Sequence, residues 1–451
     1  MEGIKITPVD KWIINPVNSF ISKSSTGGIV LMISALLAII LANSPLSHWY
    51  HELWEHRIAI SFGGEPFVDM TLHHWINDGL MAVFFFVIGL ELKREIVAGE
   101  LSNPKNAILP ITAGVGGMVF PALIFTGFSM GLETMNGWGI PMATDLAFAL
   151  GILYLLGDRV PASLKIFLTA FAIVDDLGSV LVIALFYTSE ISFMHLGIGV
   201  GALLILVLGN FIGVRNNWFY GLIGIGGVWL FFLLSGVHAT IAAILTAFTI
   251  PATVKISDSA FIRKMSNYLE KFRMADPDHD VPTLTPDQLH ILDDMETCTQ
   301  RAMTPLQKLE HEMHPLVAFI VMPIFAIANA GVTFGDSLAD AITSPVALGV
   351  MCGLFFGKLI GIFGLSTLLM KLKIVPPLEG VTTRHMLGMG FIASIGFTMS
   401  LFINELAYKP LGAVGQDYIS HAKIAIIFVS LIGGIAGYMI LKGAKRSPLA
   451  N

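Results

Sequence analysis

Two neighbouring aspartates, Asp175 and Asp176, lie in the middle of an apolar run from residue 164 to 187. The run is long enough to cross a bilayer as a helix, and a carboxylate at the bilayer midplane is costly and therefore usually functional. Two close carboxylates raise each other's proton affinity, and their oxygens also suit a hard monovalent cation once they are deprotonated. The pair predicts ion or proton handling, and a pair that only forms hydrogen bonds in a helix seam is the alternative.

Lys358 is a basic residue at the centre of a second apolar run, 346–370. Its side chain is too short to reach the membrane surface from that depth. The lysine therefore needs either an acidic partner or a lowered pKa that keeps it uncharged. We expect a salt bridge to one of the central aspartates, with a role in ion handling or in fold stability alone.

Two further apolar segments contain helix breakers together with polar residues. They are Gly137, Gly139, Pro141, Thr144 and Asp145 around the segment 138–156, and Gly388, Gly390, Gly396, Thr398 and Ser400 within 386–407. Paired interrupted segments in the two halves of a chain are typical of a transporter site built from broken helices. Carbonyls, hydroxyls and half-helix dipoles can then serve a small ion. Ordinary glycine packing between helices is the alternative.

Three groups of titratable residues lie outside these segments or at their ends. Glu91 and Glu95 flank Lys93 and Arg94 at the end of the segment 72–92, either as ordinary membrane-edge charges or as an acidic funnel for cations. His238 follows Gly236, either as a hydrogen-bonded packing residue or as a sensor.

His311 and His314 flank Glu312 in a near-match to the zinc signature HExxH. Zinc catalysis on that signature needs histidines four residues apart and a third ligand. We therefore favour a solvated helix end that titrates near neutral pH over a metal site.

The composition indicates a polytopic membrane protein, because 55% of the 451 residues are hydrophobic and only 13% are charged. The mean hydropathy is +0.76. Long continuous apolar runs favour helices over a barrel. Twelve segments are long enough to span: 28–46, 72–92, 106–128, 138–156, 164–187, 194–213, 217–235, 237–253, 315–334, 346–370, 386–407 and 421–441.

Basic residues divide unequally between alternate connections of this topology. Twenty-two Lys and Arg fall on one side and three on the other, with Lys358 inside a helix. Cytoplasmic loops are enriched in these residues, so we expect both termini in the cytoplasm and an uncleaved first helix. The two cysteines, Cys298 and Cys352, are expected to be unpaired.

Two connections are substantial. Residues 47–71 include the alternating stretch Ile58–Phe62 before Gly63-Gly64, which indicates either a β-hairpin outside the membrane or a solvated loop. Residues 254–314 are rich in charge and proline. We interpret 1–451 as a single membrane domain, with helices I–VIII in 28–253, a cytoplasmic loop at 254–314 and helices IX–XII in 315–441.

Seven strings of the chain closely resemble the NhaA-type sodium/proton antiporters of bacterial inner membranes. They are GLELKREIVAGEL (89–101), PMATDLAFALGILYLLG (141–157), FLTAFAIVDDLGSVLVIALFY (167–187), SGVHAT (235–240), LEHEMHPLVAFIVMPIFAIANAGV (309–332), GLFFGKLIGI (353–362) and GFTMSLFI (396–403). The match covers nearly every expected helix.

The resemblance implies an all-α membrane protein of twelve transmembrane helices, with inverted repeats and discontinuous helices IV and XI that cross near the ion site. Asp175 and Asp176 would be the ion- and proton-carrying carboxylates, with Na⁺ held between them. Thr144 and Asp145 would lie at the broken fourth helix, and Lys358 would be the membrane lysine paired with the first aspartate.

The family also implies regulation and assembly. Family pH regulation maps onto Glu91, Glu95, His238, Glu310, His311 and His314. Members are electrogenic, export sodium or lithium against protons, and form homodimers through a hairpin that residues 57–67 would match. The connection before Pro315 is longer than is usual in the family, and this difference concerns the pH response rather than the transport chemistry.

We therefore expect a pH-regulated, alternating-access Na⁺(Li⁺)/H⁺ antiporter in the bacterial inner membrane, in contact with lipid and not with nucleic acid. It would be a secondary transporter rather than an enzyme and would need no cofactor, and the chain shows no GxxxxGK[ST] loop for ATP. A cation channel with an acidic selectivity ring is one alternative. An intramembrane aspartyl protease is another, although its two aspartates face each other from different helices.

Overall fold

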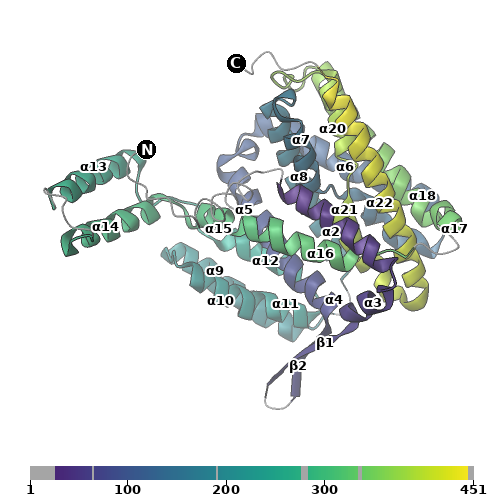
Figure 1. The fold of residues 1–451 in the computed structure, drawn as a ribbon, viewed down its shortest axis with the longest axis horizontal. Helices are drawn as coiled ribbons and strands as arrows, with labels where there is room; N and C mark the ends of the chain where they lie inside the picture. The colour runs from purple at the N-terminus through teal and green to yellow at the C-terminus, as the bar shows by residue number, and fades with distance from the viewer. Residues whose placement is uncertain (1–25, 63–64, 189–190, 276–282, 334–337, 445–451) are drawn as a thin grey trace.

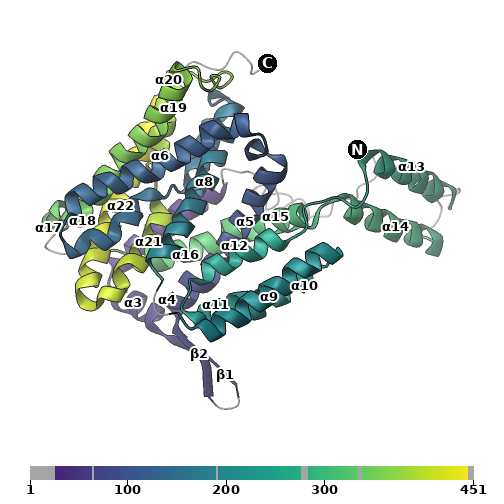
Figure 2. The same ribbon diagram turned by 180° about the vertical axis from the view of Figure 1, so that it is seen from behind.

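The fold is almost entirely helical in the computed structural model, which describes residues 26–62, 65–188, 191–275, 283–333 and 338–444 (Figures 1 and 2). The first half contains α2 (Thr26–Ala42), α3 (Ser47–Glu55), α4 (Leu72–His74), α5 (Met81–Ala98), α6 (Pro104–Ser129), α7 (Leu146–Leu155), α8 (Ala162–Phe186), α9 (Phe193–Ile212), α10 (Asn217–Ile223), α11 (Leu230–Ser235) and α12 (Ala239–Thr249). The second half contains α13 (Asp258–Met274), α14 (Pro286–Ala302), α15 (Pro305–Leu316), α16 (Met322–Asn329), α17 (Leu338–Thr343), α18 (Pro345–Cys352), α19 (Leu365–Lys371), α20 (Thr383–Ile392), α21 (Phe397–Tyr408) and α22 (Gly412–Lys442).

Short 3₁₀ and π-helical turns join or extend these helices. The 3₁₀ turns are η3 (Glu100–Ser102), η4 (Glu133–Met142), η5 (Gly157–Arg159) and η10 (Lys409–Leu411). The π turns are η2 (Trp75–Leu80), η6 (Gly224–Trp229), η7 (Val317–Val321), η8 (Gly353–Gly357) and η9 (Leu359–Gly364). Lys358 lies between η8 and η9, so the expected span 346–370 contains π-helical turns, which occur often at functional positions.

Eight helices in the described ranges are long and apolar enough to cross a membrane, or nine if the bent pair α2 and α3 forms one span. They include Glu133–Leu155, Ala162–Phe186, Pro305–Asn329, Pro345–Lys371 and Phe397–Lys442. The last of these runs through the expected span 421–441 and the second half of the expected span 386–407, whose first half lies in α20. The expected span 237–253 contains only the shorter helix α12, so the count of twelve remains a prediction.

Two of the segments with helix breakers depart from a continuous helix. In the first, η4 ends at Met142 and α7 begins at Leu146 after an extended stretch that includes Ala143. In the second, α20 ends at Ile392 and α21 begins at Phe397. Each gap frees backbone groups that a helix would pair internally, so other partners must satisfy them inside a bilayer.

Small residues allow the helices around the Lys358 segment to pack closely. A Cβ on Gly361 would collide with the backbone of Gly116 on α6, and a Cβ on Gly357 would meet the backbone of Pro121 at 2.5 Å. These contacts place the Pro345–Lys371 span directly against α6, which in turn packs on α8.

A β-hairpin projects from the helical body, as the alternating stretch at 58–62 indicated (Figure 1). Strand β1 (Arg57–Phe62) pairs antiparallel with β2 (Glu65–Thr71), and Arg57 lies opposite Thr71. Arg57 Nε lies 3.0 Å from Asp69 Oδ1. The hydrogen bond and charge of Asp69 raise the pKa of Arg57.

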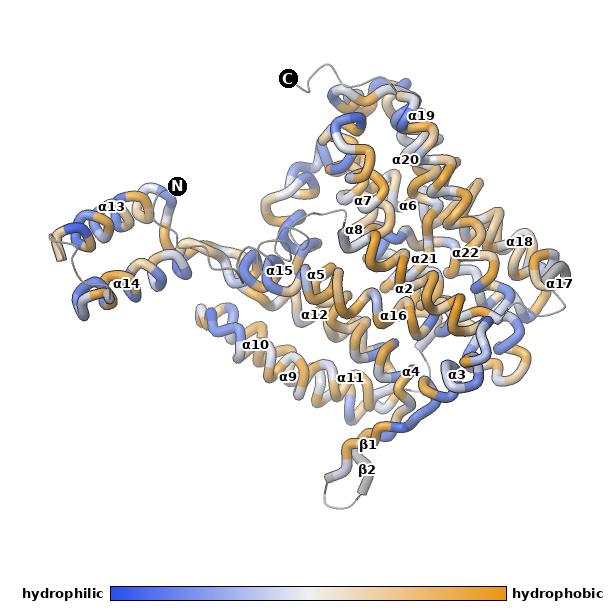
Figure 3. Tube along the Cα trace, viewed as in Figure 1, coloured by the Kyte–Doolittle hydropathy of each residue, from blue (hydrophilic) through white to orange (hydrophobic). Residues whose placement is uncertain are grey.

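The long connection 254–314 contains two helices, α13 and α14, that lie side by side away from the body (Figures 1 and 2). Thr285 caps α14 with a reciprocal bond to Gln288, and Pro286 occupies the first turn. Figure 3 shows many hydrophilic residues on these two helices and mostly hydrophobic ones on the body. The connection is therefore partly ordered by its own capping signals.

Candidate ion site

Asp175 and Asp176 lie inside the protein on α8, with 0% and 1% of their surface exposed. Lys358 is also fully buried, and its Nζ lies 2.6 Å from Asp175 Oδ2. The lysine also donates to the carbonyl oxygen of Met142, the last residue of η4. The expected salt bridge between Lys358 and a central aspartate is thus present, and its partner is Asp175.

Asp145 connects the two interrupted segments. As the N-cap of α7 it accepts a hydrogen bond from Phe148 N at 3.0 Å. Its other oxygen accepts from Thr398 at the start of α21, from the backbone N at 3.0 Å and from Oγ1 at 2.6 Å. The Asp145 carboxylate therefore faces the N-terminal ends of two helices, where negative charge is favoured.

Backbone groups complete the same junction. Asp145 N donates to Ile395 O at 2.7 Å, and Thr144 Oγ1 donates to Ala393 O at 3.2 Å. Thr144 also lies against Asp175. The structure thus brings together Thr144, Asp145, Asp175 and Lys358 from three separate segments.

Several oxygens at this position are available to a cation. Within the described ranges, Asp175 Oδ1, Asp176 Oδ1 and Ser179 Oγ are buried side-chain atoms without a hydrogen-bond partner. Asp176 interacts electrostatically with the carboxyl groups of Asp175, Asp145 and Glu91 and with the ammonium group of Lys358. Buried orphan carboxylate oxygens are costly, and a small hard cation or a proton would satisfy them.

Glu91, Glu95 and Glu310 gather where α5 meets α15. Arg94 binds both Glu95, at 3.0 Å, and Glu310, at 2.7 Å. Glu91 is close enough to interact with all three. This cluster links two elements that are more than 200 residues apart in the sequence, and Glu91 joins it electrostatically to Asp176.

The three histidine candidates are placed differently from one another. His238 Nε2 lies 2.8 Å from the carbonyl oxygen of Tyr187, so this nitrogen carries the proton. His311 and His314 are exposed on the surface of α15, and whether that helix end is solvated stays a prediction. Among the residues that the structure describes, no group of three His, Cys, Asp or Glu is arranged to hold a metal ion.

The structure contains a second buried ion pair that the sequence analysis did not predict. Glu405 on α21 lies 2.8 Å from Lys423 on α22, with side-chain exposures of 8% and 13%. Both residues line a cavity of about 340 Å³ near the hairpin, together with His73 and Lys409. The rule that flagged the aspartate pair, an ionisable residue inside an apolar run, also applies to Glu405.

Removing one member of this pair should destabilise the protein. A buried charge left without its partner costs about 3–5 kcal/mol, so we expect Lys423→Met to lower the thermal midpoint of the purified protein strongly. Glu405→Gln combined with Lys423→Met should recover most of the loss. Lys409→Met, an exposed lysine on the same cavity, serves as the control. Equal midpoints for the single and double variants would contradict the pairing.

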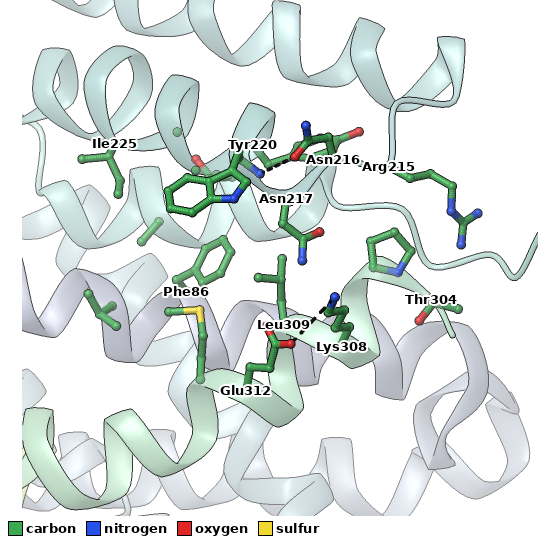
Figure 4. Close-up of a pocket in the computed structure, with 18 of the residues that line it drawn as sticks. Phe86, Arg215, Asn216, Asn217, Tyr220, Ile225, Thr304, Lys308, Leu309 and Glu312 are labelled. Carbon is green, nitrogen blue, oxygen red and sulfur yellow. Dashed lines mark hydrogen bonds and ion pairs between the residues drawn. The ribbon is translucent and has the colours of Figure 1, made fainter. Parts of the chain in front are cut away.

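A larger cleft of about 1310 Å³ is lined by residues of α10 and η6 on one side and of α5, α12 and α15 on the other (Figure 4). Phe86, Tyr220 and Ile225 line its apolar part, and Arg215 and Lys308 lie towards one end (Figure 4). Burial lowers the pKa of Arg215. The aspartate pair does not line this cleft, so the cleft and the ion site are separate.

The apolar helices are those of a membrane protein, and the buried carboxylates form a candidate ion site where interrupted segments meet. Comparison with known proteins makes the class specific, since the family model "Na⁺/H⁺ antiporter 1" matches residues 18–441. The chain belongs to this family.

The chain also aligns with proteins named as Na⁺/H⁺ antiporters along nearly their full lengths. The chain is 44% identical to Na⁺/H⁺ antiporter NhaA 1 of Saccharophagus degradans over 459 aligned positions, covering 98% of this chain and 96% of the relative. It is 45% identical to Na⁺/H⁺ antiporter NhaA of Oleidesulfovibrio alaskensis, covering 98% and 97%. It is 44% identical to NhaA 1 of Clostridium beijerinckii, covering 96% of each.

Proposed function

We propose that the protein is an electrogenic, pH-regulated antiporter that exports Na⁺ or Li⁺ from the cytoplasm in exchange for protons. Family membership supports Na⁺/H⁺ exchange in general. The observation that carries the finer proposal is the Asp175–Asp176 pair, whose orphan oxygens lie beside Lys358 and the Asp145 junction.

The exchange follows from competition at one site. When Asp175 and Asp176 are deprotonated, a cation binds their free oxygens, and protonation of the same oxygens expels it. Alternating access requires that occupancy change which face is open. Thr144 and Asp145 stand at the junction of two segments, so a small shift there changes the site's surroundings.

The arrangement of the chain in the membrane belongs to the same proposal. We infer twelve spans in two inverted repeats, discontinuous fourth and eleventh helices, cytoplasmic termini and residence in the bacterial inner membrane. We infer a homodimer joined through the 57–67 hairpin. Glu91, Glu95, Glu310, His238, His311 and His314 are the proposed pH-regulating residues, and no cofactor takes part.

Everted membrane vesicles provide the test. A preformed ΔpH should dissipate on addition of Na⁺ or Li⁺, but not K⁺, with a rate that varies between pH 6.5 and 8.5. Exchange that is absent at every pH in well-expressed protein would refute the proposal. Cation flux that continues without proton movement would support a channel instead.

A further inference from the structure

The 3₁₀ segment η4 is contacted along its length by side chains from other elements. Four of its carbonyl oxygens accept hydrogen bonds in this way. The bonds are Tyr408 Oη to Thr134 O at 2.7 Å, Tyr187 Oη to Asn136 O at 2.7 Å, Ser400 Oγ to Ile140 O at 2.7 Å, and Lys358 Nζ to Met142 O. These donors replace the internal bonds that a longer α-helix would supply.

The hydroxyl groups of the two tyrosines lie against the two glycines of η4. A Cβ on Gly137 would collide with the Tyr408 hydroxyl, and a Cβ on Gly139 would lie 3.0 Å from the Tyr187 hydroxyl. Gly139 N also donates to that hydroxyl at 3.3 Å. The glycines therefore do more than interrupt a helix, because each leaves the space into which a phenol group fits.

Each tyrosine comes from an element that carries part of the ion site. Tyr187 is the C-cap of α8, which bears Asp175 and Asp176, and Tyr408 ends α21, which begins beside Thr398. Beside Tyr187, Phe186 stacks edge-on against Trp138 of η4, with ring centroids 5.1 Å apart. The C-terminal ends of α8 and α21 thus both contact the ten-residue segment η4.

We propose that Tyr187 and Tyr408 are positioning residues for ion exchange. By fixing η4 against α8 and α21, they hold its C-terminal end, so that Met142 O stays on Lys358 and Thr144 and Asp145 stay at the carboxylate pair. Both phenol hydroxyls donate to carbonyl oxygens of η4, so the tyrosines act on the site through this segment. The His238 ring binds the Tyr187 carbonyl, which also ties α12 to this anchor.

This inference rests on the proposed exchange, and the variants Tyr187→Phe and Tyr408→Phe test it. Each keeps its ring and loses one hydroxyl. We expect the Na⁺ concentration for half-maximal exchange to rise about threefold to tenfold, the factor that one lost hydrogen bond supplies. The maximal rate at saturating Na⁺ and the thermal midpoint should change much less. Tyr154→Phe, on α7 beyond the junction, should leave all three quantities unchanged.

Gly139→Ala gives a second test that does not depend on removing a hydroxyl. Its methyl group should displace the Tyr187 phenol and raise the half-maximal Na⁺ concentration, but add little in the Tyr187→Phe background. If both tyrosine variants exchange ions with the same half-maximal Na⁺ concentration as wild type, this inference is refuted while the proposed function stands. A lower thermal midpoint with an unaltered half-maximal Na⁺ would also overturn it, since that result describes a structural role. Absent exchange in wild type would instead refute the proposed function.

Discussion

Asp176→Asn is expected to abolish Na⁺- and Li⁺-dependent ΔpH dissipation in everted vesicles. The substitution keeps the size of the side chain but removes the charge from a carboxylate whose Oδ1 is buried without a hydrogen-bond partner in the described part of the chain. Loss of a charged ligand worth about 3 kcal/mol lowers binding on the order of 100-fold. We expect Asp175→Asn to impair exchange as well, because it also releases Lys358.

The chain contains its own control for this substitution. Asp293 and Asp294 form a second adjacent pair on α14, outside the helical body, and Asp293 is exposed. Asp293→Asn makes the same chemical change in solvent and should leave exchange at the wild-type level. Exchange that survives in Asp176→Asn at normal expression would remove this aspartate from the site.

Lys358→Gln is expected to lower the stability of the protein sharply. Lys358 is fully buried and holds both Asp175 and the end of η4. The variant leaves a buried carboxylate unpaired, at a cost of about 3–5 kcal/mol, so the thermal midpoint of the purified protein should fall. Asp175→Asn in the same chain should restore much of it, because it removes the unpaired charge.

The function of Lys358 can be separated from this stability effect in a stabilised background. We expect Lys358→Gln to retain electrogenic exchange there, since the lysine acts by holding Asp175. Electroneutral exchange would instead assign a transported proton to Lys358. Lys371→Gln, an exposed lysine at the end of the same span, controls for the loss of a positive charge.

The central pairing was predictable because membrane interiors leave an ionisable residue few options. A buried lysine at 358 and a carboxylate pair at 175–176 had to find partners within the bilayer. Which aspartate pairs was not derivable from spacing alone, since neighbouring residues point about 100° apart on a helix and the choice depends on helix packing. The break before Asp145 followed from its glycines and proline.

Other features depend on tertiary contacts that sequence patterns do not record. Glu405 was overlooked, and its pairing with Lys423 requires α21 and α22 to lie together. Gly137 and Gly139 leave room for the phenol groups of Tyr408 and Tyr187, and these contacts join residues that are distant in sequence. The helices within 254–314 had local signals, among them the Thr285 cap, but the high charge of the connection suggested only a loop.

The most direct test of a shared cation and proton site is proton release on cation binding. Purified protein in weakly buffered detergent solution, near the pH at which exchange is half-maximal, would be mixed with Na⁺ while the pH is recorded. We predict release of protons with saturable dependence on Na⁺, and no release in Asp176→Asn. Saturable Na⁺ binding by wild type without proton release would contradict competition at Asp175 and Asp176.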